Sequence, residues 1–248
     1  MKTVLITGCS SGFGLDNARY FLDRDWTVIA TMRDPKSDLL PPSDRLRILP
    51  LDVTDADSIA RTVKAAGPID VLVNNAGVGQ VSPLEGVSMA KIRELFETNT
   101  LGTIAMTQAV LPQMREQRSG VIVNVTSGVT FQPLPLMSIY TASKAAVNAF
   151  SESVALELAA FGVRVRIVIP GRAPETAFSE NVRDRMGITV PEPYMDMATQ
   201  VFGRFQESGG PVTYSRDVSE AVWRAATDPA CPIRLPAGAD AVARAPSS

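Results

Sequence analysis

The chain has 248 residues, of which 45% are hydrophobic and 20% are charged, and its formal net charge is −2. These values are typical of globular proteins, and a chain of this length commonly forms one α/β domain. The composition favours neither a nucleic-acid partner nor an anionic membrane, because there is no basic excess. The sequence contains no histidine, which excludes a Ser-His-Asp triad and any metal site built on histidine.

The start of the chain and its two cysteines predict a cellular location. An apolar run at residues 4–6 follows the first residue almost at once, so we expect no signal peptide. No stretch approaches the roughly 20 apolar residues that a membrane-spanning helix needs. Cys9 lies in a glycine-rich loop, so we expect it and Cys231 to be reduced thiols. We therefore expect a cytoplasmic protein without a membrane partner.

Strand and helix patterns alternate along the chain, which predicts a parallel sheet with helices on both faces. Strands are predicted at residues 2–7, 26–31, 46–51, 69–73, 121–125, 163–169 and 233–235. Helices are predicted from the glycine loop to about residue 24 and at residues 56–66, 89–117, 138–161 and 218–226. Residues 34–44 are rich in proline and polar side chains, which indicates an irregular crossover. No repeat or linker divides the chain, so we expect one domain over residues 1–248.

A glycine-rich loop, Thr-Gly-Cys-Ser-Ser-Gly-Phe-Gly, follows the first predicted strand. Its glycines permit a tight turn and a close approach of the backbone to a pyrophosphate, at the amino end of a helix whose dipole favours anions. Its serines add hydroxyl donors. An ordinary strand-to-helix turn is the alternative, but such a turn seldom needs glycines at this spacing. The residues expected to bind phosphate are Gly8, Ser10, Ser11, Gly12, Phe13 and Gly14.

Tyr140 and Lys144 are spaced i and i+4, so their side chains share one face of a helix. A phenol with a pKa near 10 is a poor acid–base catalyst at neutral pH. A positive charge at about 4 Å contributes roughly 4 kcal/mol at an effective dielectric of about 20, which corresponds to about three pKa units. Ser127, shortly before the pair, supplies a further hydroxyl. The pattern predicts an acid–base site, and a solvated helix face is the alternative.

Together these motifs resemble the short-chain dehydrogenase/reductase family over nearly the whole chain, and their wording is similar to its steroid and retinol dehydrogenase branch. A lone Tyr-x-x-x-Lys is weak evidence, but the complete set in register is strong. The resemblance implies a doubly wound Rossmann fold with a parallel seven-stranded sheet of order 3-2-1-4-5-6-7. It also implies a homodimer or homotetramer. The markers, in chain order, are the glycine loop, Asp52, Asn75-Ala76-Gly77, Asn99, Ser127, Tyr140, Lys144 and Pro170-Gly171.

The resemblance assigns catalytic roles. Tyr140 would give a proton to a substrate carbonyl during reduction, or remove one from an alcohol during oxidation, while Ser127 holds the same oxygen. Lys144 would lower the pKa of Tyr140 and bind the nicotinamide ribose. Asn99 would join a proton relay through water to the lysine. Because Asn99 lies on an apolar helix stripe, we expect it to be buried, with a bond to its own helix backbone as a compatible alternative. No metal is expected.

The resemblance also assigns the cofactor contacts. Asp52 and Val53 would contact adenine, the small residues after the fourth strand would admit the ribose, and Pro170 and Gly171 would meet the nicotinamide carboxamide. Thr176 is carried over for the same region, although it lies one residue later than the family places its threonine. Asn74 is expected to brace the sheet instead. The cofactor contacts expected outside the glycine loop are Arg33, Asp52, Val53, Asn75, Ala76, Gly77, Tyr140, Lys144, Pro170, Gly171 and Thr176.

Coenzyme preference depends on the end of the second predicted strand. An acidic residue there would bind the NAD ribose and repel a phosphate. Met32 takes that place and Arg33 follows, and an arginine can pair with the 2′-phosphate of NADP. The alternatives are Asp34 as the ribose carboxylate of NAD, or an exposed loop pair of Arg33 and Asp34. The sequence favours NADP over NAD.

Residues 172–212 interrupt the strand–helix alternation and contain several prolines, methionines and aromatic residues. In the family, the equivalent insertion covers the substrate, so a lid is expected here. A peripheral helical pair that simply packs on the body is the alternative. Residues 131–137 are also largely apolar and lie between the expected serine and tyrosine. Together these segments favour an apolar substrate.

The leading functional hypothesis is an NADP(H)-dependent oxidoreductase that interconverts a secondary alcohol and a ketone, or an aldehyde. An NAD-dependent dehydrogenase of the same family is the first alternative. A catalytically silent dinucleotide sensor or scaffold is the second, and the complete set of Ser127, Tyr140 and Lys144 argues against it. Extended epimerase and dehydratase relatives have a different glycine spacing and a larger carboxy-terminal domain. Neither the substrate nor the direction of the reaction is encoded in the motifs.

Overall fold

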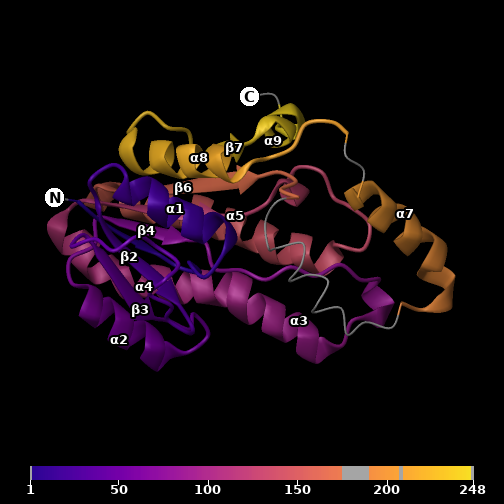
Figure 1. Ribbon diagram of the computed structural model, residues 1–248, viewed down its shortest axis with the longest axis horizontal. Helices are drawn as coiled ribbons and strands as arrows, with labels where there is room; N and C mark the ends of the chain where they lie inside the picture. The colour runs from indigo at the N-terminus through magenta and orange to yellow at the C-terminus, as the bar shows by residue number, and fades with distance from the viewer. Residues whose placement is uncertain (1, 175–189, 207–208, 247–248) are drawn as a thin grey trace.

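A seven-stranded parallel sheet of order β3-β2-β1-β4-β5-β6-β7 forms the centre of the computed structural model, which describes residues 2–174, 190–206 and 209–246 (Figure 1). The strand order and the parallel pairing confirm the predicted doubly wound fold. The strands are β1 Thr3–Ile6, β2 Thr27–Met32, β3 Leu46–Pro50, β4 Val71–Asn74, β5 Gly120–Val125, β6 Val163–Pro170 and β7 Arg234–Ala237.

Helices cover both faces of the sheet. Figure 1 shows α1 and α8 on one side and α2 and α4 on the other. The helices of the described residues are α1 Gly12–Leu22, α2 Ala56–Ala66, α3 Met89–Phe96, α4 Gly102–Gln117, α5 Ser138–Leu158, α7 Met195–Gln206, α8 Ser215–Thr227 and α9 Ala239–Arg244. Shorter 3-10 turns are η1 Leu84–Gly86, η3 Gly128–Thr130, η4 Ala159–Phe161 and η5 Glu192–Tyr194. None of these described helices is long and apolar enough to cross a membrane.

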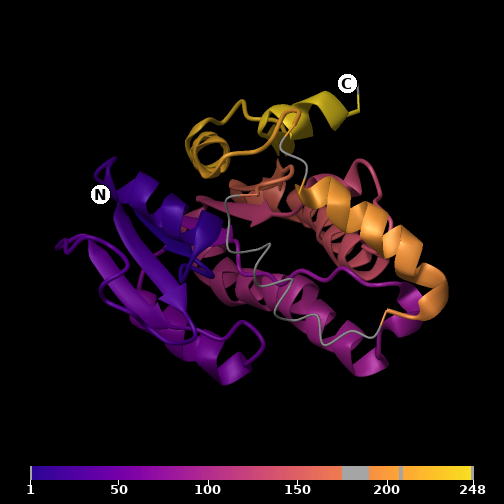
Figure 2. The same cartoon turned by 45° about the vertical axis from the view of Figure 1, so that its right-hand side comes forward.

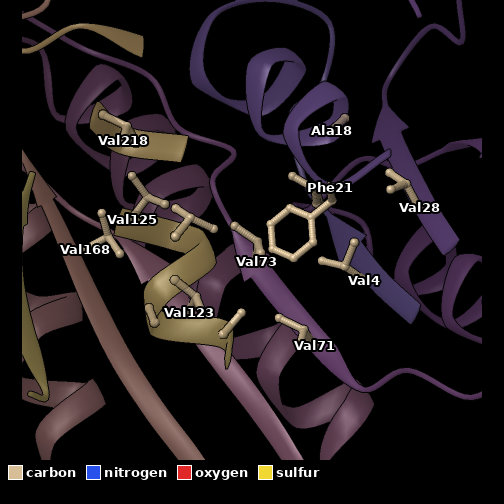
Figure 3. Packing of buried hydrophobic residues seen from close by; sticks show 14 of the residues in the cluster. Val4, Ala18, Phe21, Val28, Val71, Val73, Val123, Val125, Val168 and Val218 are labelled. Carbon is tan, nitrogen blue, oxygen red and sulfur yellow. The ribbon is translucent and has the colours of Figure 1, made fainter. Parts of the chain in front are cut away.

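Two hydrophobic cores fill the spaces between the sheet and its helices. Val71 and Val73 of β4 face α1 and α8, whereas Leu72 between them belongs to the core on the opposite face. This alternation follows from the period of two along a strand. Figure 3 shows Phe21 of α1 lying among the valines of the central strands, and Phe21 is fully buried. Burying one such side chain contributes about 1.5–3 kcal/mol.

Asparagines join the middle of the sheet to the helices behind it. Asn74 at the end of β4 lies beside Asn124 of β5, and its Nδ2 donates to Asn124 Oδ1 at 2.9 Å and to Thr107 Oγ1 at 3.3 Å. Asn124 Nδ2 in turn donates to Ser151 Oγ of α5 at 2.7 Å. Buried amides need such partners. The structure thus confirms that Asn74 braces the sheet.

The helix predicted over residues 89–117 is interrupted, and this corrects the sequence interpretation. A π-helical segment, η2 Glu97–Leu101, separates α3 from α4. Its extra residue per turn changes the direction of the side chains that follow, and such segments are frequent at functional sites. Asn99 lies in this segment and is fully buried, as its position on the apolar stripe predicted.

The carboxy-terminal part contains elements that the sequence did not predict, namely η5, α7 and α9. The last predicted helix begins earlier than expected, at Ser215, where the Asp217 carboxylate accepts from Tyr214 N at 2.9 Å. The cysteines are free thiols and both are buried. Burial raises the pKa of the Cys9 thiol to about 12, which keeps it unreactive.

Candidate active site

The glycine loop forms a tight turn between β1 and α1, and side chains would not fit there. Gly8 has φ +74°, and a Cβ on it would lie 2.8 Å from Ala76 Cα. Gly14 lies in the first turn of α1 and packs against the loop, and a Cβ there would overlap the Gly8 carbonyl oxygen. Gly12, with φ +55°, starts α1. The first N–H groups of a helix have no partner within it, so this turn presents donors to an anion.

Asn75 and Thr7 hold the loop against the end of β4. Asn75 Nδ2 donates to Thr7 O at 3.0 Å and to Gly8 O at 3.2 Å. Thr7 Oγ1 accepts from Asn75 N at 3.0 Å and from Ala76 N at 2.9 Å. The side-chain nitrogen of Asn75 therefore supports the phosphate loop, whereas the sequence assigned this residue to the ribose.

A cavity of about 690 Å³ extends from the glycine loop along the carboxyl edge of the sheet. This volume is within the range of roughly 300–1,000 Å³ that is common for small-molecule sites. Its lining includes the expected residues Gly8, Ser10, Ser11, Gly12, Phe13, Arg33, Asp52, Val53, Asn75, Ala76 and Gly77. It also includes Met32, which the sequence placed at the end of the second strand without a contact of its own, and seven residues that the sequence reasoning missed: Leu51, Thr54, Val78, Gly79, Glu94, Glu97 and Thr98.

Other expected cofactor residues do not line this cavity. Gly14 lies behind the loop that it supports, and Pro170 and Gly171 lie at the end of β6. Thr176 lies outside the described residues. The missed lining residues of α3 and η2 belong to no motif. Only their position shortly before Asn99 in the sequence could have indicated them.

Asp52 and Arg33 lie at one end of the cavity. Thr54 donates to Asp52 Oδ1 from its backbone N at 2.9 Å and from its hydroxyl at 2.7 Å. The Thr54 backbone bond is the largest cause that lowers the pKa of Asp52, the hydroxyl bond and the Arg33 charge lower it further, and burial opposes them. Arg33 is exposed and faces the cavity, whereas Asp34 is not among the lining residues.

Ser127 and Tyr140 are brought together from different elements. Ser127 lies two residues after β5 and caps η3, and Tyr140 lies in the first turn of α5. Their side chains are hydrogen-bonded. Tyr140 is only 5% exposed. Burial raises the pKa of Tyr140 to about 12, and the bond to Ser127 lowers it in part.

Lys144 lies one helical turn beyond Tyr140 and is buried. Its Nζ donates to the Val125 carbonyl at 3.1 Å, and burial lowers its pKa to about 8. Most of the lysine is therefore still protonated at neutral pH. The sequence predicted that Lys144 would lower the pKa of Tyr140, but in the structure the phenol pKa is raised. The reason is that burial of the phenol outweighs the favourable interactions around it.

Asn99 joins the loop after β4 to α5. Its Oδ1 accepts from Val78 N at 2.8 Å, and its Nδ2 donates to Val78 O at 2.9 Å and to Ser143 Oγ at 3.1 Å. A Cβ on Gly77 would lie 3.2 Å from both Asn99 Oδ1 and Lys144 Nζ. The Asn99 amide and the Lys144 ammonium therefore both lie close to Gly77. The Asn99 amide also joins the loop after β4 to α5 through its hydrogen bonds to Val78 and Ser143.

An apolar cluster surrounds Tyr140. Ala198 and Val201 of α7 belong to it, and Figure 2 shows α7, in orange, beside α5. Gln80 precedes Val81 of the cluster, and neither of its buried side-chain polar atoms has a hydrogen-bond partner among the described residues. The other cluster members are Val81, Val129, Leu136 and Met137.

Comparisons with known proteins agree with this arrangement. A family model described as short chain dehydrogenase matches residues 2–187. An uncharacterized oxidoreductase YusZ of Bacillus subtilis is 36% identical over 91% of this chain and 85% of its own. Retinol dehydrogenase 8 of Bos taurus is 41% identical over 68% of this chain. Estradiol 17-beta-dehydrogenase 1 of Rattus norvegicus is 42% identical over 74% of this chain. The alignments span 58% and 57% of the length of these last two relatives.

Solved structures show the same fold. A short-chain dehydrogenase from Streptomyces avermitilis superposes with a TM-score of 0.84 at 32% identity, covering 98% of this chain and 90% of its own. The closed form of a serine dehydrogenase complexed with NADP+ superposes with a TM-score of 0.82 at 30% identity, covering 99% and 97%. From the family match, the relatives and the fold, the chain belongs to the short-chain dehydrogenase/reductase family of oxidoreductases.

Proposed function

We propose that the protein is an NADP(H)-dependent oxidoreductase that interconverts a secondary alcohol and a ketone, or an aldehyde, on an apolar substrate. The observation that carries the proposal is the hydrogen-bonded pair of Ser127 and Tyr140 with the buried Lys144 one turn away. These groups lie at the carboxyl edge of a parallel sheet, where ligands of doubly wound folds bind.

The residues along this edge fit a nicotinamide dinucleotide. The glycine loop would hold the pyrophosphate, because side chains on Gly8 or Gly14 would fill the space that close backbone approach requires. Asp52 and Val53 would hold adenine, the backbone of residues 75–77 would face the ribose, and Pro170 and Gly171 would meet the carboxamide. The bound cofactor supplies or accepts the hydride.

Arg33 supports a preference for NADP(H). It is exposed at the cavity beside Asp52, where a guanidinium can pair with a 2′-phosphate. A related short-chain dehydrogenase from Burkholderia cenocepacia was solved with NADP, and a 3-ketoacyl-(acyl-carrier-protein) reductase from Brucella melitensis was solved with NADH. Both coenzymes therefore occur among the relatives, and the arginine is the reason for the assignment here.

Tyr140 would donate a proton to the substrate oxygen during reduction. With a pKa near 12, its phenol is neutral at physiological pH, which is the form that can donate. Ser127, already bonded to the phenol, would hold the same substrate oxygen. The Lys144 ammonium would stabilise the phenolate as the proton leaves. Asn99 would keep the Gly77–Val78 backbone in place beside that ammonium through its bonds to Val78.

The apolar cluster around Tyr140 supports an apolar substrate. Val81, Val129 and Met137 belong to the same buried cluster as Tyr140, and α7 adds Ala198 and Val201. We propose that residues 172–212 cover the substrate. Helix α7 belongs to this segment, whereas residues 175–189 lie outside the described part of the chain. The names of a retinol and an estradiol dehydrogenase among the relatives support the same class of substrate.

We also propose a cytoplasmic homodimer or homotetramer. Leu101 and Leu156 support subunit contacts, because their exposed fractions are 48% and 82% on the two longest helical segments. Exposed apolar side chains of this size are typical of contact surfaces when they gather.

Replacing the proposed proton donor tests the proposal. A panel of ketones, aldehydes and alcohols is first assayed with each coenzyme by the absorbance of the reduced nicotinamide. Tyr140→Phe should then reduce turnover of the best substrate by about 10²–10⁴-fold, because the transferable proton is removed, while coenzyme binding persists. Tyr20→Phe, which removes a phenol hydroxyl from α1, is the control. Turnover of Tyr140→Phe within about twofold of wild type, in an assay limited by chemistry, would contradict the assignment.

A further inference from the structure

The backbone turn after β6 is held by side chains from two distant segments. Gly171 N donates to Thr213 Oγ1 at 2.9 Å, and Arg172 N donates to Asp240 Oδ2 at 2.7 Å. Thr213 N donates back to Arg172 O at 2.8 Å. Both ends of the 172–212 segment therefore meet at one point, where Asp240 of α9 joins them.

Thr213 and Asp240 form a buried pair. Thr213 is 1% exposed and Asp240 is 2% exposed. Thr213 Oγ1 lies 2.6 Å from Asp240 Oδ1 and 3.0 Å from Ala237 O, so its single proton goes to one of these acceptors while the oxygen accepts from Gly171 N. Charge-assisted bonds to a buried carboxylate are the stronger kind. The pair is therefore a rigid anchor for the turn.

Two glycines are explained by this anchor. A Cβ on Gly171 would overlap the Asp240 carboxylate. A Cβ on Gly238, which has φ +94°, would overlap Thr213 Oγ1. The glycine of the Pro170-Gly171 motif thus makes room for the carboxylate of α9, in addition to any role toward a ligand.

The anchored turn touches the catalytic end of β5. A Cβ on Gly128, the residue after Ser127, would lie 3.2 Å from Pro170 O and 3.5 Å from Gly171 Cα. The turn therefore forms one wall beside the serine that holds the substrate oxygen. A misplacement of about 1 Å in such a wall can reduce a rate by about 10²-fold.

We propose that Thr213 and Asp240 are positioning residues that set the nicotinamide end of the cofactor site. This inference rests on the proposed function, because it requires a nicotinamide against Pro170 and Gly171. The carboxy-terminal helix α9 thereby determines how the nicotinamide is placed relative to Ser127 and Tyr140. A merely structural anchor would support the fold without distinguishing one end of the cofactor from the other.

Binding of whole and truncated coenzyme separates these two roles. The probes are NADPH and 2′-phospho-ADP-ribose, which lacks the nicotinamide ring but keeps the adenine, the pyrophosphate and both riboses. Thr213→Val removes the hydroxyl at nearly constant volume, and Asp240→Asn replaces one of the two carboxylate oxygens, which accept from Thr213 and Arg172, by an NH2 group that can only donate. Each should weaken NADPH by about tenfold, because the turn loses a bond that fixes its position, and reduce turnover by about 10²-fold. Each should leave the affinity for 2′-phospho-ADP-ribose within about twofold.

Matched variants complete the design. Thr213→Ser restores the hydroxyl and should recover most of the NADPH affinity. Arg244→Gln removes an ion pair whose atoms lie 3.9 Å apart, on a side chain 40% exposed, and should behave like wild type. Thermal unfolding of every variant shows whether the chain folds. If Asp240→Asn does not fold, Thr213→Val still tests the inference.

The outcomes are distinct. Equal loss of both probes, or no loss of either in folded Thr213→Val, would overturn the positioning role. A selective loss of NADPH that Thr213→Ser reverses would support it. Failure of the wild-type protein to bind any nicotinamide dinucleotide would overturn the proposed function and this inference together. If the wild type binds NADPH normally and the variants bind both probes as the wild type does, this inference alone is overturned.

Discussion

The two ends of the proposed cofactor site are both backbone turns, but opposite chemistry holds them. At the glycine loop, the Asn75 amide donates to the carbonyl oxygens of Thr7 and Gly8. At the end of β6, the oxygens of Thr213 and Asp240 accept from the N–H groups of the turn. The first clamp occupies acceptors and leaves helix N–H groups for an anion. The second occupies N–H donors, so this turn has fewer of them to offer to a phosphate.

The largest expected effect lies between these ends, at Lys144. Its pKa of about 8 is below the ordinary lysine value of about 10.4, so burial of the charge destabilises the folded protein. The penalty is complete below pH 8, where the lysine is charged in both folded and unfolded states. It declines as pH rises from 8 toward the unfolded pKa. Lys144→Met should therefore stabilise the fold by about 2–3 kcal/mol near neutral pH, after subtracting about 1 kcal/mol for the lost bond to Val125.

Urea unfolding at several pH values measures this difference. The advantage of Lys144→Met over wild type should narrow by about 2 kcal/mol between pH 6.5 and 9.5, while turnover stays low throughout. Lys64→Met, at an exposed lysine of α2, is the control and should show no such trend. A pH-independent difference would mean that burial of the lysine charge is not the cause of the added stability.

Glycine substitutions compare the two ends directly. Gly14→Ala places a methyl against the Gly8 carbonyl, and Gly171→Ala places one against the Asp240 carboxylate. Each should reduce the free energy of unfolding by about 1–3 kcal/mol. Gly14→Ala should weaken both NADPH and 2′-phospho-ADP-ribose, whereas Gly171→Ala should weaken only NADPH. Isothermal titration with both probes and chemical unfolding are the measurements.

Two further variants sharpen the glycine comparison. Gly203→Ala in α7 has nothing within 4 Å of the new Cβ and should be stabilised by about 0.5–1 kcal/mol. In Gly171→Ala, adding Asp240→Ala removes the overlapping carboxylate, so part of the lost stability should return while NADPH stays weakly bound. Loss of the truncated probe in Gly171→Ala, with its retention in Gly14→Ala, would reverse the assignment of the two ends.

The same contrast explains what the sequence could and could not predict. The glycine loop and the residues after β4 lie in two recognisable motifs, and the cavity lining includes most of the residues that these motifs selected. At the other end only Pro170 and Gly171 lie in a motif. Thr213 and Asp240 belong to segments with no local pattern, and their pairing depends on how α9 folds back on the sheet. No spacing rule could have selected Asp240 from the 26 acidic residues.

Burial and helix register were the other limits of sequence reasoning. The apolar stripe correctly predicted that Asn99 is buried, but not the π-helical segment, because one extra residue in a turn barely changes the pattern. The i, i+4 spacing correctly predicted one helix face for Tyr140 and Lys144. It predicted the wrong direction for the pKa of Tyr140, because spacing carries no information on how deeply the phenol is buried.

The smallest effect expected on coenzyme binding concerns coenzyme choice at the glycine-loop end. Arg33→Ala should weaken NADP(H) by about tenfold, the lower end for a hydrogen bond to a charged group, because the guanidinium is exposed. NAD(H), which has no 2′-phosphate, should change by less than about twofold. Arg61→Ala, at an exposed arginine outside the cavity lining, is the control. Equal losses for both coenzymes would show that Arg33 supports the loop without binding the phosphate. A loss confined to NAD(H) in Asp34→Ala would instead identify Asp34 as the ribose carboxylate, and the anion-binding character of this end would then stop at the pyrophosphate.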